Sequence, residues 1–119
     1  IEILDKLREM LSDFNVIQTT SPLDGKSTWI EIFPASVSKS QTAEWLAEEL
    51  SVEPSNIVSL GNDYNDIDLL EWSPIRYVVE NAPADLKARF PAVASNNNGG
   101  VAEAVERWIS QKKLIADSS

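Results

Sequence analysis

Apolar positions along most of this chain alternate between helical spacing and short, continuous runs typical of buried strands. The segment "QTAEWLAEEL", for example, places apolar side chains at i, i+3, i+4 and i+7, which predicts an amphipathic helix. The pattern predicts helices over residues 41–50, 66–72, 83–90 and from 101 onward, and strands over 56–62, 75–81 and 92–95. Alternating helices and strands favour a parallel sheet covered by helices, so we expect an α/β fold.

The first 34 residues follow a different pattern. Residues 1–12 have helical periodicity, whereas residues 14–20 and 27–34 read as strands. Pro22 and the pair Asp24-Gly25 lie between the two strands and favour a turn, which predicts a β-hairpin. The chain therefore divides into two predicted domains, residues 1–34 and 35–119.

The composition excludes several classes of function. The chain of 119 residues has 10 basic and 19 acidic residues, a formal net charge of −9 and a pI of about 4.3. This charge disfavours nucleic acids and anionic lipids as partners, because both need basic surfaces. No apolar run approaches the roughly 18 residues of a membrane span, and we expect a cytoplasmic protein. Without Cys or His, the chemistry must use carboxylates, amides, hydroxyls and Lys.

Oxygen-bearing side chains gather where the strand ending at Leu60 should stop. The run "GNDYND" places Asn62, Asp63 and Asp66 at the carboxyl end of that strand, where open α/β sheets bind ligands. Carboxylate and amide oxygens are ligands that Mg²⁺ prefers, so these three residues are candidate metal ligands. Asn and Asp also form turns and cap helices, and that simpler interpretation stays open.

The charge pattern around this run favours a cation site. Residues 40–75 contain no Lys or Arg, whereas they contain eight acids: Glu44, Glu48, Glu49, Glu53, Asp63, Asp66, Asp68 and Glu71. A solvated acidic helix face explains the Glu residues equally well. Lys39 stands alone just before the first helix of this region, either as a surface lysine or as an ammonium that offsets phosphate charge.

Four segments in order resemble the C-terminal part of the haloacid dehalogenase superfamily. They are Pro34-(x)₄-Lys39, "IVSLGNDYNDIDLL", "VVENAPADLKARF" and "VASNNNGGVAEAVERWI". The pattern is closest to the Cof-type phosphatases and their sugar-phosphatase relatives. The resemblance implies a partial Rossmann-like core over residues 35–119, preceded by a helix and hairpin from the end of the inserted cap domain.

The resemblance also implies a function: Mg²⁺-dependent hydrolysis of a small phosphorylated metabolite, such as a sugar phosphate, through an aspartyl-phosphate. Lys39 matches the lysine that neutralises the nucleophile and the transferring phosphoryl group. Asp66 matches the acid that holds Mg²⁺, Asn65 matches the asparagine beside the phosphate, and Asn81 matches the loop after the next strand. For Asn81, a simple turn before Pro83 is the alternative.

Two features depart from the family pattern. The first acid of the motif is Asn62 here, so metal affinity should fall unless Asp63 substitutes for it. No Asp-x-Asp-x-Thr/Val nucleophile segment precedes Lys39, so we expect the 119 residues alone to be inactive. The strand over 57–60 would then have an unpaired edge. We expect that edge to associate with the nucleophile-bearing half of the enzyme or with a second copy, or to pair with the chain's own hairpin.

Two other classes of protein remain as alternatives. A non-catalytic interaction module derived from this fold would explain Asn62 as decay of the metal site. A receiver-like signalling domain is disfavoured, because its lysine should follow the acidic cluster rather than precede it. Among the tryptophans, Trp45, Trp72 and Trp108 are expected in the core, whereas Trp29 on the hairpin is a candidate to face the substrate.

Overall fold

The computed structural model describes residues 2–118, with side chains through 115, so the outermost residues of the two predicted domains, 1 and 119, lie outside it. The chain order is α1 (Glu2–Met10), β1 (Phe14–Thr20), β2 (Thr28–Pro34), α2 (Lys39–Glu49), β3 (Val58–Gly61), α3 (Ile67–Trp72), β4 (Ile75–Val79), α4 (Ala84–Arg89), β5 (Ala92–Val93) and α5 (Gly100–Ser118). Short 3-10 helices cover Pro54–Asn56, Tyr64–Asp66 and Asn96–Asn98. Every predicted helix and strand is present.

The predicted hairpin is confirmed. β1 and β2 pair antiparallel from Phe14↔Pro34 to Thr20↔Thr28. Asp24 organises the turn by accepting hydrogen bonds from the backbone N–H groups of Ser27 at 2.8 Å and Lys26 at 2.9 Å. Hydrogen bonds from Ser27, followed by that from Lys26, lower the pKa of Asp24 to about 2.

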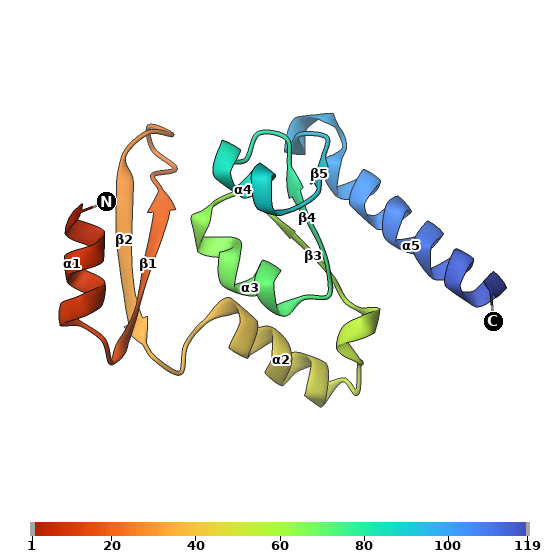
Figure 1. Cartoon of the computed structure of the whole chain (residues 1–119), viewed down its shortest axis with the longest axis horizontal. Helices are drawn as coiled ribbons and strands as arrows, with labels where there is room; N and C mark the ends of the chain where they lie inside the picture. Colours follow the sequence, from red (N-terminus) through yellow and green to blue (C-terminus); the bar gives the residue numbers. More distant parts are fainter. Residues whose placement is uncertain (1, 119) are drawn as a thin grey trace.

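The second sheet is parallel, as the alternation of helices and strands predicts. Its order is β3-β4-β5, with β4 in the centre and the register running from Val58↔Ile75 to Gly61↔Val78. In Figure 1 this sheet lies between α3 and α4 on one side and α5 on the other. The fold is therefore α/β, with helices on both faces of a parallel sheet.

The hydrophobic core belongs to this sheet and its helices. The cluster of buried side chains consists of Leu70, Tyr77, Val78, Val79, Ala82, Leu86, Phe90, Val93 and Ala104. Fully burying one such Leu or Val contributes about 1.5–3 kcal/mol relative to leaving it exposed. The core thus fixes the sheet and the loops at its carboxyl end.

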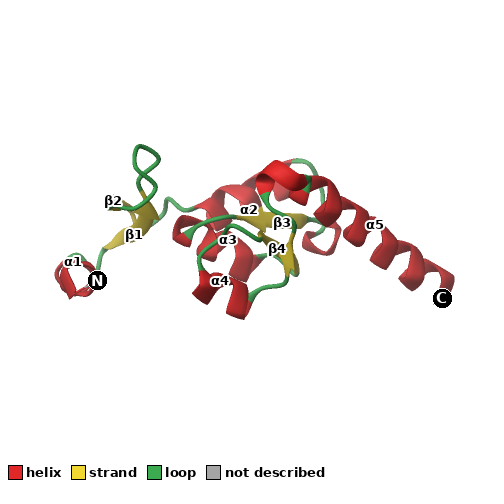
Figure 2. Ribbon diagram, turned by 90° about the horizontal axis from the view of Figure 1, so that it is seen from above, coloured by secondary structure: helices red, strands yellow, loops and turns green. Residues whose placement is uncertain are grey.

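The hairpin stands apart from that core, as Figure 2 shows from above. Leu4 of α1 and Val16 of β1 are buried outside the main cluster. The radius of gyration is 16.1 Å, compared with about 13.5 Å for a compact domain of this length. These observations agree with a division near residue 35, although the division itself stays an interpretation.

The edge of β3 is open. Within the part of the chain that the structure describes, β3 pairs only with β4, and the hairpin forms a separate sheet. The hairpin therefore does not cover the edge, which removes one of the expected outcomes. Association with another chain stays a prediction.

Apolar residues on two helices of the core are also exposed. The predicted apolar stripe of α2 is only partly buried, because Leu46 and Leu50 are exposed. On α5, Val101 and Ile109 are likewise exposed, and the helix continues away from the sheet (Figure 1). The expectation that Trp45 lies in the core is wrong, since Trp45 is 60% exposed on α2. Among residues 2–118, no helix has both the length and the apolar character that crossing a membrane requires.

Candidate active site

The loop after β3 folds tightly around a glycine. A Cβ atom on Gly61 would lie 2.8 Å from Cβ of Asp66 and 3.0 Å from Cδ1 of Leu70, closer than real Cβ contacts allow. Only glycine therefore lets the loop turn back so closely on the start of α3. This close approach brings the Asp66 carboxylate back to the end of β3.

Asp66 and Lys39 meet at this point. The Lys39 ammonium contacts Oδ1 of Asp66, although the two residues are 27 positions apart. Oδ2 of the same carboxylate accepts hydrogen bonds from the backbone N–H groups of Asn62 at 2.9 Å and Asp63 at 3.3 Å. Asp66 is buried, whereas the Lys39 side chain is 48% exposed and reaches the contact from α2. The structure thus unites two of the predicted site residues.

The start of α2 is held in place by α3. Ser38 caps α2 by accepting a hydrogen bond from Gln41 N, and Oδ2 of Asp68 accepts one from Ser40 N at 2.8 Å. Burial raises the pKa of Asp68, but the hydrogen bonds from Ser40 and Ser38 outweigh it, so this pKa lies below its ordinary value. Because Lys39 lies between Ser38 and Ser40, these contacts fix the position from which its side chain extends.

Asp63 turns away from Lys39. Both of its carboxylate oxygens accept hydrogen bonds from Thr19 and Thr20 at the end of β1. The simpler interpretation of the acidic run, a set of turn and capping residues, is therefore partly right, because the carboxylates of Asp63 and Asp66 both accept backbone hydrogen bonds. A metal-ligating role for Asp63 stays a prediction.

Two cavities border the loop. A cleft of about 670 Å³ lies between the hairpin and the core, and its lining includes Trp29, Glu31, Asn62, Asn65 and Asn81. The predicted site residues Asn62, Asn65 and Asn81 therefore share one cleft, and Trp29 reaches it from β2.

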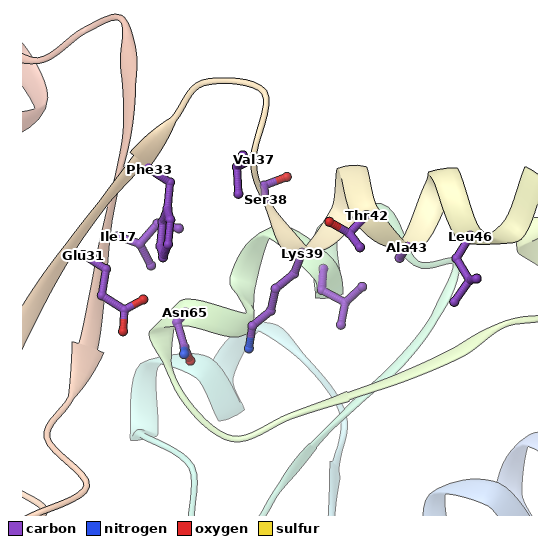
Figure 3. Close-up of a pocket in the computed structure, with 11 residues that line it drawn as sticks. Ile17, Glu31, Phe33, Val37, Ser38, Lys39, Thr42, Ala43, Leu46 and Asn65 are labelled. Atoms are coloured by element: carbon purple, nitrogen blue, oxygen red, sulfur yellow. The ribbon is translucent and has the colours of Figure 1, made fainter.

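The second cavity has a volume of about 470 Å³ and lies between the hairpin and α2. Figure 3 shows the Lys39 side chain extending from the start of α2 and Asn65 on the loop before α3, with Ile17 and Phe33 on the hairpin side. Asn65 lines both cavities, so it stands between the Lys39 side and the cleft.

Two further contacts join the loops at the carboxyl end of the sheet to their neighbours. Oδ1 of Asn81 accepts a hydrogen bond from Asn96 N at 3.3 Å, so Asn81 joins two loops as well as lining the cleft. The Tyr64 hydroxyl donates to Oδ1 of Asp85 on α4 at 3.0 Å. Burial, followed by this hydrogen bond and the charge of Asp85, raises the pKa of Tyr64. The loop between β3 and α3, residues 62–66, is therefore tied to α2, α4 and the hairpin.

The oxygen-bearing side chains of the loop after β3 can supply part of the coordination shell of one metal ion. Among the described side chains, those of residues 2–115, no group of three acidic, His or Cys residues is placed to hold a metal ion. Mg²⁺ usually takes one or two carboxylates and completes its shell with water and substrate phosphate. Asp66 and the exposed Asn62 fit that minimal role, because they offer one carboxylate and one amide oxygen at the same loop.

The structure thus places a lysine–aspartate contact and an amide-lined cleft at the carboxyl end of a parallel sheet. A family model described as haloacid dehalogenase-like hydrolase matches residues 1–105. The chain belongs to the haloacid dehalogenase-like hydrolases. The predicted resemblance is confirmed.

Individual relatives agree with this assignment. The chain is 32% identical over 106 residues to a phosphoglycolate phosphatase of Methanothermobacter thermautotrophicus, covering 88% of this chain and 46% of that protein. Among solved structures, a haloacid dehalogenase-like hydrolase from B. subtilis superposes with a TM-score of 0.73 at 24% identity, over 88% of this chain and 36% of that one.

A third relative carries a ligand in its structure. The sucrose-phosphatase from Synechocystis sp. PCC6803, solved in complex with sucrose and phosphate, superposes with a TM-score of 0.69 at 25% identity, over 90% of this chain and 45% of that one. The chain thus spans less than half the length of these relatives.

Sequence reasoning missed three contributors to the site. Thr19 and Thr20 bind Asp63, and Asp68 holds the start of α2. The two adjacent hydroxyls at the end of β1 give no local signal, since their partner lies more than 40 residues away. Ser38 did carry a signal, because serine just before an amphipathic helix is a preferred N-cap.

Proposed function

We propose that this chain supplies the lysine and metal-binding side of a Mg²⁺-dependent phosphatase site. The observation that carries the proposal is the contact between the Lys39 ammonium and Asp66, at the carboxyl end of β3. The carboxylate is held by two backbone N–H groups, so its position does not depend on Lys39 alone. Asn62 and Asp66 are the proposed metal ligands, with Asp63 as the alternative donor.

Each residue then has a task that follows from its position. Phosphoryl transfer depends on positioning and on neutralising charge, so an ammonium beside the transferring group lowers the barrier. Lys39 provides that positive charge and also offsets the negative charge of the nucleophilic carboxylate. Asn65, which separates the two cavities, is placed to orient the phosphate from the cleft side, and Asn81 borders the same cleft. When bound, Mg²⁺ would neutralise phosphate oxygens and orient them.

The nucleophile must come from outside these 119 residues. We propose an aspartate on a segment that pairs with the open edge of β3. Its carboxylate would attack phosphorus and displace the substrate's alcohol, and water would then hydrolyse the resulting aspartyl-phosphate to free phosphate. The open edge, together with the exposed apolar residues of α2 and α5, supports such a continuation of the sheet. A second copy of this chain is the alternative occupant of that edge.

The cleft suggests the size and polarity of the substrate. Its volume of about 670 Å³ suits a small phosphorylated metabolite. The side chains of Asn62, Asn65, Asn81 and Glu31 offer hydrogen-bond partners, and Trp29 offers an aromatic face. Sugar phosphates combine hydroxyl groups with a phosphate, so we propose this substrate class, in keeping with the sucrose-phosphatase likeness.

Turnover of p-nitrophenyl phosphate tests the proposal. We expect no turnover by the 119 residues alone. We expect Mg²⁺-dependent turnover once they are joined to the segment that carries the aspartate nucleophile, with EDTA abolishing it. Turnover by the chain alone, or none by the joined protein in Mg²⁺, would contradict the proposal, and the second result would favour a non-catalytic interaction module.

A further inference from the structure

The Asp63 carboxylate connects the loop after β3 to the hairpin, a contact that the catalytic proposal does not use. Its Oδ2 accepts hydrogen bonds from Thr20 N at 2.6 Å and from the Thr19 hydroxyl at 3.2 Å. Its Oδ1 accepts one from the Thr20 hydroxyl at 3.0 Å. The Asp63 side chain is buried, so solvent competes little for these bonds. We call Asp63, Thr19 and Thr20 the hairpin clasp.

The backbone N–H of Thr20 takes part in the contact between the hairpin and the loop after β3. Thr20 is opposite Thr28 in the hairpin register, yet its N–H donates to Asp63 rather than across the hairpin. The next N–H, that of Ser21, donates to Ser27 O at 2.7 Å within the hairpin. The Thr20 N–H therefore points away from β2, on the outer edge of β1. Its hydrogen bond forms only while the hairpin contacts the loop of residues 62–66.

The opposite end of β1 is held at the linker between hairpin and core. The Asn15 side-chain amide donates to Val37 O at 2.7 Å and to Ala35 O at 3.2 Å. Asn15 and Thr20 are separated by roughly 17 Å of extended strand. A rotation of about 10° at the linker would move Thr20 by about 3 Å, far enough to break a hydrogen bond.

We propose that Asp63 is a positioning residue that keeps the hairpin closed over the cleft. The hairpin presents Trp29 and Glu31 to the cleft opposite Asn62 and Asn65, so opening the clasp widens the space between these two walls. Hydrogen bonds from neutral donors to a charged carboxylate are stronger than those between neutral groups. Three such bonds therefore stabilise the closed arrangement of the hairpin. The catalytic consequence rests on the proposed function, whereas the clasp itself does not.

Amide hydrogen exchange of the full chain, followed residue by residue by NMR, tests the clasp directly. We expect Asp63→Ala to speed exchange at the Thr20 amide about tenfold to a hundredfold, because its acceptor is lost, with little change at Ser21. The double variant Thr19→Val with Thr20→Val keeps the strand and the loop and removes two donors, so we expect a smaller acceleration at position 20. Thr28→Val, opposite Thr20 on the exposed face of β2, is the matched control and should change neither amide.

The same variants separate the clasp from other roles of Asp63. An unprotected Thr20 amide in the wild-type chain, or unchanged exchange in Asp63→Ala, would overturn the proposal. A metal ligand would behave differently: Asp63→Asn would weaken Mg²⁺ binding, and the threonine variants would leave exchange at position 20 unaltered. In the joined phosphatase, the double threonine variant should raise KM more than it lowers kcat, because Lys39 and Asp66 remain in place. Since exchange requires no turnover, the clasp and the proposed function fail independently.

Discussion

Replacing Lys39 with alanine in the joined phosphatase is expected to lower kcat about a thousandfold. The ammonium is placed at the carboxyl end of β3, where the developing phosphoryl charge would lie, and no other Lys or Arg occurs between residues 40 and 75. Steady-state hydrolysis of a phosphate monoester at saturating Mg²⁺ measures the effect. The variant should still fold, because the Lys39 side chain is half exposed and Asp66 keeps its two backbone hydrogen bonds.

Two further variants make this result specific. Lys6→Ala removes a lysine of α1 that pairs with Glu2 at 3.7 Å on the surface, and kcat should stay within about twofold. Lys39→Arg keeps the charge but alters its shape, so activity should fall between the alanine variant and the wild type. A Lys39→Ala enzyme within tenfold of wild-type kcat would contradict the assigned role.

Replacing Leu70 with alanine is expected to destabilise the chain by about 2–5 kcal/mol. Leu70 is 0% exposed and lies under the active-site loop, where its Cδ1 approaches Gly61. Truncation removes buried apolar surface and leaves a cavity beneath the turn that positions Asp66. Urea unfolding followed by circular dichroism measures the change in the free energy of unfolding.

Leu23 provides the matched control for this substitution. It lies in the hairpin turn and is 86% exposed, so Leu23→Ala should change the free energy of unfolding by less than about 0.5 kcal/mol. A loss below about 1 kcal/mol for Leu70→Ala would mean that the loop is not supported from beneath as the structure indicates.

The elements were predictable because their signals are local. The strand and helix periods of residues 41–93 and the Asp24-Gly25 turn depend on near neighbours, so each element appears within a few residues of its predicted bounds. The contact of Lys39 with the acidic loop was expected from the family resemblance, whereas the residues alone left a surface lysine open.

The direction of Asp63 and the exposure of Trp45 were not predictable in the same way. Asp63 is next to Asn62 in the sequence, which does not show whether its carboxylate faces Lys39 or the hairpin. That choice depends on Thr19 and Thr20, which are distant in sequence. Trp45 is a large apolar residue of the kind expected in a core, yet its side chain is 60% exposed on α2. Periodicity shows which face is apolar but not what covers it.

The central claim is that the loop after Leu60 and the Lys39 amine form a pocket for Mg²⁺ and a phosphoryl group. NMR titration of the isotopically labelled chain with Mg²⁺, and then with inorganic phosphate, tests it most directly. We predict saturable shifts concentrated at the amides of residues 61–66 and at the Lys39 amine, and their loss in Asp66→Asn. Shifts confined to the acidic face of α2, or none at the loop at high Mg²⁺, would contradict the account.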